Sequence, residues 1–231
     1  MTPLPALLRH EVRLQYRYGI YAAYGVVVVF YALILLTGRP FVPDWLVAFI
    51  VFSDPSALGF FFLGGLMLLE KGQGVRTALA VAPVSARDYL IAKAVPLTAL
   101  AVVAVIVLGL AKTGPVNWLV LVPVVVLTSV FYIGIGAAVA LQFRTVNAYL
   151  IGSAALLTPI ILPALVALVE PFPLLAALIP STAQFRLMLV ALGGAPASGL
   201  EIAVMILVLC AAALLSWIAG ERALGTELGR K

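Results

Sequence analysis

"AVPLTALAVVAVIVLGLA", residues 94–111, lies between Lys93 and Lys112 and contains no charged side chain. An α-helix of this length is about 27 Å long, close to the ~30 Å thickness of the hydrocarbon core of a bilayer. Backbone polar groups in lipid must be hydrogen-bonded within the protein, and the stretch lacks the polar–apolar alternation of a barrel strand. We therefore expect a transmembrane helix at 94–111.

The rest of the chain repeats this pattern. Of its 231 residues 65% are hydrophobic and only 10% are charged, whereas about 25% are charged in a typical soluble domain. The composition predicts an all-α integral membrane protein with a single transmembrane domain over residues 1–231. Spans are expected at about 18–38, 55–69, 94–111, 117–141, 147–169 and 202–220. Residues 45–53 either lengthen the second span or form a separate half-helix.

The basic residues predict the orientation of these spans. Six spans place both termini on one side of the membrane, together with the loop at 70–93. That side would hold most of the 14 basic residues: Arg9, Arg13, Arg17, Lys71, Arg76, Arg87, Lys93, Arg144, Arg222, Arg230 and Lys231. The other side would hold Arg39, Lys112 and Arg186. The positive-inside rule then predicts a multi-pass protein of the plasma (inner) membrane with both termini in the cytoplasm. The net charge of +5 thus reflects topology, and we expect no nucleic acid partner.

Residues 4–17, "LPALLRHEVRLQYR", precede the first span. Arginine recurs every fourth position, and an apolar residue stands one position earlier each time. The basic positions are Arg9, Arg13 and Arg17, and the apolar ones are Leu8, Val12 and Tyr16. On a helix this places a basic stripe beside an apolar one, which predicts an amphipathic interfacial helix in contact with membrane lipids. The alternative is a simple helical extension of the first span.

Residues 171–200 are mostly apolar but are interrupted by four prolines. A long helix is therefore excluded. We expect a short helix over 181–192 on or within the outer leaflet, with Ser181 as its N-cap.

The predicted spans carry no ionisable side chain near their centres. Four carboxylates, Asp54, Glu70, Glu170 and Glu201, fall at predicted span ends. This argues against an ion-coupled carrier, which usually binds its ion through intramembrane charged groups or unwound helices. The chain also lacks the metalloprotease pattern H-E-x-x-H and the phosphate-binding loop G-x-x-x-x-G-K-[ST]. We expect neither an enzyme nor a cofactor or metal site in this chain.

The loop at 70–93 has its own predicted structure. Gly72 and Gly74 allow a tight turn, and residues 75–82 then form a short helix that Pro83 ends. Ser85 and Asp88 form an S-x-x-D capping signature for the next helix. A short, mostly apolar helix outside the membrane has to shield its apolar side chains from water by contact with another surface. Lipid headgroups or a groove in a protein partner would both provide one, and the residues alone favour neither.

Residues 70–93, "EKGQGVRTALAVAPVSARDYLIAK", resemble the cytoplasmic loop of ABC-2 type transporter permeases. That loop commonly reads E-[KR]-x-x-G-T-L-E-x-L-x-x-[ST]-P-[LV]-S-x-x-[ED]-[YI]-L-x-x-K. The matching residues are Glu70, Lys71, Gly74, Leu79, Pro83, Val84, Ser85, Asp88, Tyr89, Leu90 and Lys93. Residues 52–71 and 179–189 are similar to the fluoroquinolone-export permease branch. The chain departs from the pattern at Val75-Arg76-Thr77, where the family usually has T-L-E.

The resemblance implies a transport mechanism. Two permeases, either two copies or this chain and a sister permease, would pair around a path lined by their first, second and fifth spans. The short loop helix would act as a coupling helix in a cleft of a separate ABC ATPase subunit, which would hold ATP and Mg. The implied docking residues are Glu70, Gly74, Val75, Arg76, Thr77, Leu79, Val81 and Pro83. Hydrophobic or amphipathic small molecules, drug-like or lipid-like, would be exported. The alternative is a non-transporting membrane scaffold or lipid-binding protein.

Overall fold

The computed structural model describes residues 4–38, 41–74 and 84–227, and within these ranges the chain is helical without strands. The elements are α1 (Leu4–Arg17), α2 (Ile20–Thr37), α3 (Asp44–Ala57), η1 (Leu58–Phe62), α4 (Leu63–Gly72), α6 (Ala86–Ala111), α7 (Trp118–Ala140), α8 (Val146–Ile161), η2 (Leu162–Leu168), η3 (Leu174–Leu178), α9 (Pro180–Ala191) and α10 (Gly199–Glu227). The element η1 is a turn of π-helix, whereas η2 and η3 are 3₁₀ helices.

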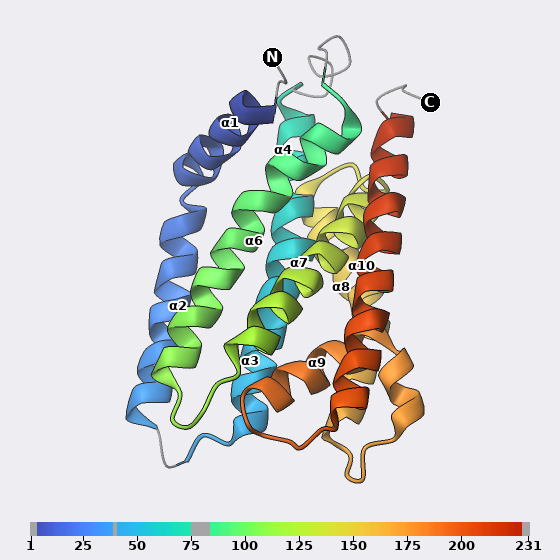
Figure 1. Cartoon of the computed structure of the whole chain (residues 1–231). Helices are drawn as coiled ribbons and strands as arrows, with labels where there is room; N and C mark the ends of the chain where they lie inside the picture. The colour runs from blue at the N-terminus through green and yellow to red at the C-terminus, as the bar shows by residue number, and fades with distance from the viewer. Residues whose placement is uncertain (1–3, 39–40, 75–83, 228–231) are drawn as a thin grey trace.

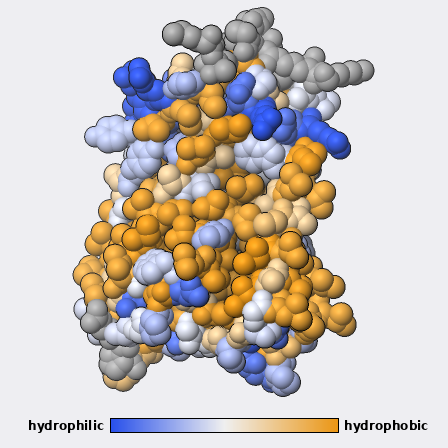
Figure 2. All heavy atoms as spheres, in the orientation of Figure 1, coloured by the Kyte–Doolittle hydropathy of each residue, from blue (hydrophilic) through white to orange (hydrophobic). Residues whose placement is uncertain are grey.

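Six of the helical segments are long and apolar enough to cross a membrane. They are Ile20–Thr37, Asp44–Gly72, Ala86–Ala111, Trp118–Ala140, Val146–Leu168 and Gly199–Glu227. The prediction of an all-α, multi-pass membrane protein with six spans and an additional N-terminal helix is thus confirmed. The two termini and both flanks of residues 75–83 lie at one end of the bundle (Figure 1), here called the terminal end. Hydrophobic side chains cover the middle of the face in Figure 2, and hydrophilic ones gather toward its two ends.

The second span is longer than predicted. It runs from Asp44 to Gly72 through α3, η1 and α4, so residues 45–53 lengthen the span. The expected start at residue 55 was wrong, because Asp54 lies inside this span and does not mark its end. In the structure the Tyr24 hydroxyl of α2 donates a hydrogen bond to Asp54 Oδ2, which gives this carboxylate a polar partner within the bundle.

Helix α1 is a separate element and does not continue α2. Gly19 adopts a φ of 70°, which lies in the left-handed region that glycine tolerates, and the helical path breaks there. The buried residues of α1 are polar: Glu11 is 4% exposed and Gln15 is 0% exposed. Two residues of the predicted apolar stripe face outward, since Val12 is 46% and Tyr16 is 76% exposed, whereas Leu8 is half-buried. The sequence pattern thus identified the helix but missed which face packs against the bundle.

Helix α9 closes the bundle at the end opposite to the termini, where it crosses beneath the spans (Figure 1). Its bounds agree with the predicted helix at 181–192 to within one residue at each end. The N-cap prediction was wrong, because Pro180 is the first helical residue and Ser181 lies buried in the first turn. Proline suits this position, since the first helical N–H has no partner within the helix in any case. Nearly all side chains of α9 are buried.

Helix α7 lies at the centre of the bundle and packs most extensively against α10. Glycines allow this close approach. A Cβ on Gly134 would lie 2.4 Å from the Ser216 carbonyl, and a Cβ on Gly220 would lie 2.6 Å from the Gly134 carbonyl. Gly59 and Gly136 form a similar contact between η1 and α7. These small residues therefore serve packing within the chain.

Candidate functional site

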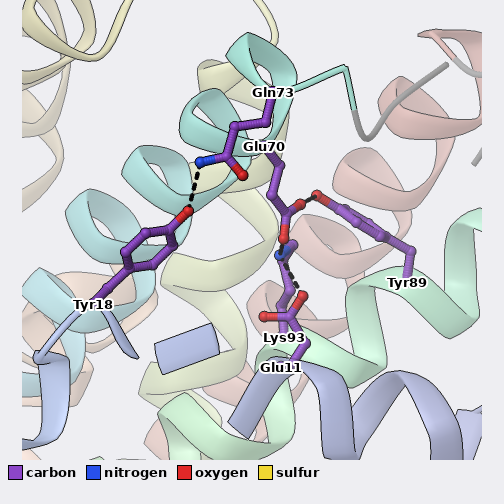
Figure 3. A network of polar contacts seen from close by, with 6 residues as sticks. All are labelled: Glu11, Tyr18, Glu70, Gln73, Tyr89 and Lys93. Carbon is purple, nitrogen blue, oxygen red and sulfur yellow. Dashed lines mark hydrogen bonds and ion pairs between the residues drawn. The ribbon is translucent and has the colours of Figure 1, made fainter. Parts of the chain in front are cut away.

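A buried polar network joins α1, α4 and α6 at the terminal end (Figure 3). Lys93 Nζ of α6 donates to Glu70 Oε1 of α4 at 2.6 Å and to Glu11 Oε1 of α1 at 2.7 Å. The Tyr89 hydroxyl donates to the second oxygen of Glu70. The Lys93 ammonium also lies 4.7 Å from the centre of the Tyr89 ring. Three helices that are distant in sequence are therefore held by one ammonium group.

The start of α6 positions two members of this network. Ser85 caps the helix: its hydroxyl accepts a hydrogen bond from the Asp88 N–H at 3.0 Å and donates to Asp88 Oδ2 at 2.7 Å. The predicted capping signature is thereby confirmed. Tyr89 and Lys93 follow one turn apart, on the same face of α6. The cap thus fixes the register in which both side chains reach Glu70 at the end of α4.

The network contains two carboxylates and one ammonium in a nearly dry environment. Lys93 is 0%, Glu70 is 3% and Glu11 is 4% exposed. Burial raises the pKa of Glu11 to about 7, although the neighbouring Lys93 ammonium acts in the opposite direction. Within the described residues Glu11 Oε2 has no hydrogen-bond partner, whereas both oxygens of Glu70 are engaged. Burial therefore favours the protonated form of Glu11.

Further polar contacts extend the network to the junction between α1 and α2. Gln73 Nε2 donates to the Tyr18 hydroxyl at 2.8 Å (Figure 3), and the Tyr21 hydroxyl donates to Gln15 Oε1 at 2.9 Å. A longer ion pair of 3.8 Å joins Lys71 of α4 to Glu227 of α10. The last turn of α4, immediately before residues 75–83, thus has contacts with α1, α6, α10 and the α1–α2 junction.

The structure places some of the residues that the sequence singled out. Glu70 is buried in the network, so its side chain is not on the surface of the loop. Gly74 is exposed in a turn with a φ of 74°. The remaining predicted docking residues lie outside the described residues: Val75, Arg76, Thr77, Leu79, Val81 and Pro83. Arg9, Arg13 and Arg17 are exposed on α1, on a different face from Glu11.

Sequence reasoning missed three functional candidates. The amphipathic pattern at residues 4–17 rests on the arginines and their apolar neighbours and does not include Glu11. Lys93 entered the prediction only as one of the basic residues that indicate the orientation of the spans. Asp54 was assigned to a span end, yet it lies inside the second span, ten residues after Asp44. The prediction that Asp54 falls at a span end was therefore wrong. The signal available for Glu11 and Gln15 was their spacing with Leu4, Leu7, Leu8 and Leu14 along one side of the helix.

Two apolar grooves open beside the second span. The first, of about 400 Å³, is bounded by the second span, the fifth span formed by α8 and η2, and α9; its lining includes Phe49, Phe61, Leu157 and Phe185. The second, of about 340 Å³, lies nearer the terminal end and is lined by the start of α2, by residues 61–69 of the second span and by Leu150. Phe61 contributes to both grooves, so they are neighbours along one face.

A second ion pair, between the buried Arg186 and the exposed Glu170, lies at the α9 end. Arg186 Nη1 donates to Glu170 Oε1 at 2.6 Å and to the Ala167 carbonyl at 3.0 Å, and Nη2 donates to the Pro196 carbonyl at 3.1 Å. The guanidinium group also lies over the ring of Phe172. These contacts attach α9 to the segments that precede and follow it, which indicates a structural role for Arg186.

Across the described ranges, no three His, Cys, Asp or Glu side chains are grouped so that they could hold a metal ion. No protein-family model, curated protein or solved structure matches the chain.

Proposed function

We propose that this chain is the membrane-spanning permease subunit of an ATP-binding cassette exporter. It would move hydrophobic or amphipathic cargo, drug-like or lipid-like, by using ATP that a separate subunit hydrolyses. The observation that carries the proposal is the buried Glu11–Glu70–Lys93 network. It rigidly connects the two helix ends that flank residues 75–83 to the N-terminal helix and to the spans.

The network supports a mechanical role for the loop. Residues 75–83 begin two positions after Gln73 and end two positions before Ser85, and both flanks belong to rigid helices. A force applied to the loop by a partner would act on α4 and α6 together. Because Lys93 also binds Glu11, α1 would follow the same movement. An ATPase that pushed on the loop would thus move the second and third spans together with α1.

The grooves support the proposed path. Their walls come from the start of the first span, from the second span and from the fifth span. These are the spans expected to line the path of an ABC-2 type permease. The lining side chains are almost entirely apolar, which suits cargo with a hydrophobic body.

The proposal includes partners and location. The chain would pair with a second copy or a sister permease and with an ABC ATPase subunit that binds ATP and Mg. It would reside in the plasma (inner) membrane with the terminal end in the cytoplasm, in agreement with the excess of basic residues there. No nucleic acid partner is proposed, and no catalytic site is assigned to this chain.

The test uses the chain co-expressed with an ABC ATPase from the same gene neighbourhood, recognised by its phosphate-binding loop. The purified complex is reconstituted into liposomes, and ATP hydrolysis and ATP-dependent cargo flux are measured. We expect Leu79→Asp to abolish both association and flux, because it places a charge on the apolar side of the proposed docking helix. Thr226→Asp, an equal charge at an exposed site on the terminal end, is the control and should retain them. Full coupling in Leu79→Asp would overturn the docking role.

A second candidate is a non-transporting scaffold or lipid-binding protein, and α1 provides the observation in its favour. Val12 and Tyr16 are exposed beside Arg9, Arg13 and Arg17. Such a face suits the surface of an anionic membrane. This candidate predicts that the chain associates with no ATPase and that ATP drives no flux in the same experiment.

A further inference from the structure

Asp54 stands apart from the other buried carboxylates of the chain. Glu11 and Glu70 both pair with Lys93. Asp54 forms no ion pair with any described residue; its one side-chain partner is the neutral Tyr24 hydroxyl, which engages Oδ2. It is half-buried, and Oδ1 accepts no hydrogen bond from the described part of the chain.

Because Asp54 lies inside the second span, the absence of an ion-pair partner among the described residues makes its charged form energetically unfavourable. Ten residues of α-helix separate it from the start of the second span, which corresponds to about 15 Å. A carboxylate at such a depth is expensive unless it is paired, and ionisable residues inside spans usually mark a functional site. A phenol hydroxyl orients the carboxylate but does not neutralise its charge. A proton or a positively charged group has to neutralise it, and no described residue supplies such a group.

The surroundings of Asp54 indicate what kind of cation fits. Along the second span it lies between Phe49 and Phe61, which both line the first groove. Tyr24 lies one turn along α2 from Ile20, which lines the second groove. Neither Asp54 nor Tyr24 lines a groove itself, but each lies within about two helical turns of a residue that does. A cation with an apolar body would place its charge at Asp54 and its body in a groove.

A bare metal ion fits this site poorly. Calcium takes six to eight oxygen ligands, and magnesium requires a near-ideal octahedron. Asp54 and Tyr24 supply two side-chain groups, and no acidic or histidine cluster accompanies them in the described residues. A protonated amine needs fewer acceptors, because a single carboxylate provides a charge-assisted hydrogen bond.

We propose that Asp54, oriented by Tyr24, binds the protonated amine of an amphipathic cargo whose apolar body occupies the adjoining grooves. This inference rests on the proposed transport function and narrows its cargo to cationic amphiphiles. Tyr24 is a positioning residue in this scheme, because it acts through the carboxylate.

The experiment measures binding to the purified chain in phosphatidylcholine nanodiscs, without ATPase or ATP. The probes are 9-aminoacridine, which is cationic at neutral pH, and acridine, which has nearly the same ring system but is largely neutral. Fluorescence anisotropy of each probe reports its affinity.

We expect Asp54→Asn to weaken 9-aminoacridine binding by about tenfold, since it removes a charged hydrogen-bond acceptor, and to leave acridine binding unchanged. Asp54→Glu should keep a preference for the cation, and Glu227→Gln, at an exposed carboxylate, is the matched control.

A second measurement uses the unaltered chain. Dicyclohexylcarbodiimide modifies carboxyl groups in apolar surroundings, and mass spectrometry locates the modified peptide. We expect 9-aminoacridine, but not acridine, to protect Asp54 from modification. Equal binding of the cation by wild type and Asp54→Asn, or modification of Asp54 that neither probe reduces, would overturn the proposal and would indicate a carboxyl that holds only a proton.

The two proposals can fail separately. If cation binding depends on Asp54 but no ATPase associates and no ATP-driven flux occurs, the exporter proposal fails and the binding site stands. If ATP-driven flux occurs and Asp54→Asn binds 9-aminoacridine as wild type does, the exporter stands and the cation site fails.

Discussion

Glu11 and Glu70 share one ammonium group but differ in their other hydrogen bonds. Both lie within hydrogen-bonding distance of Lys93 Nζ. Glu70 also receives the Tyr89 hydroxyl, whereas Glu11 Oε2 is buried and unpaired in the described structure. Burial raises the pKa of Glu11 to about 7, although the Lys93 ammonium acts in the opposite direction. The consequence is a docking contact of α1 that depends on pH.

The sign of this dependence follows from the direction of the shift. The folded chain holds the Glu11 proton more tightly than the unfolded chain, in which the pKa is near 4.5. The associated stability is complete below about pH 4.5 and is lost as the pH rises through about 7. We expect a loss on the order of 1–3 kcal/mol in the free energy of unfolding, measured by thermal unfolding in detergent micelles. Glu11→Gln should remove most of this slope and Glu227→Gln should preserve it; a Glu11→Gln protein with the wild-type slope would contradict the assignment.

Among the elements, α7 and α10 form the most extensive helix contact, and this contact depends on glycines that have no side chain. Gly134 faces the backbone of Ser216 and Trp217, and Gly220 faces Gly134 in return. Lipid provides no hydrophobic driving force between helices, so close van der Waals packing has to stabilise such a pair. A methyl group at this crossing would push the two backbones apart.

Gly134→Ala tests this packing. We expect it to destabilise the chain by about 1–3 kcal/mol, because the added Cβ would lie 2.4 Å from the Ser216 carbonyl. Gly65→Ala is the matched control, since nothing lies within 4 Å of the position of its Cβ. The control should shift the free energy of unfolding by less than about 1 kcal/mol. Equal thermal stability of the two variants would show that α7 and α10 have more room than the structure indicates.

For the whole molecule, the hydrophobicity of the sequence predicted where the helices lie. The exact span limits and the buried helix faces depend on contacts between residues that are distant in sequence, and these were missed. Each of the six predicted spans overlaps a helical segment long and apolar enough to cross a membrane, and the short helix α9 was found between prolines. The start of the second span was missed because the Tyr24–Asp54 hydrogen bond joins residues 30 positions apart. The inward face of α1 was missed because Glu11 meets Lys93 across 82 positions. The coupling helix at residues 75–82 stays a prediction, since residues 75–83 lie outside those described.

The exporter proposal also requires that the terminal end face the cytoplasm, where an ATPase binds ATP. This orientation can be tested by cysteine labelling, because Cys210 is the single native cysteine and can be replaced by alanine. In that background, Thr113→Cys lies at the end opposite to the termini and Thr226→Cys at the terminal end, both at exposed positions. A membrane-impermeant maleimide should label Thr113→Cys in intact spheroplasts and Thr226→Cys only after lysis. The excess of basic residues at the terminal end is the physical reason, because it opposes translocation of that end. The reverse pattern would place the loop at 70–93 outside the cell, where no ATP-driven subunit could act on it.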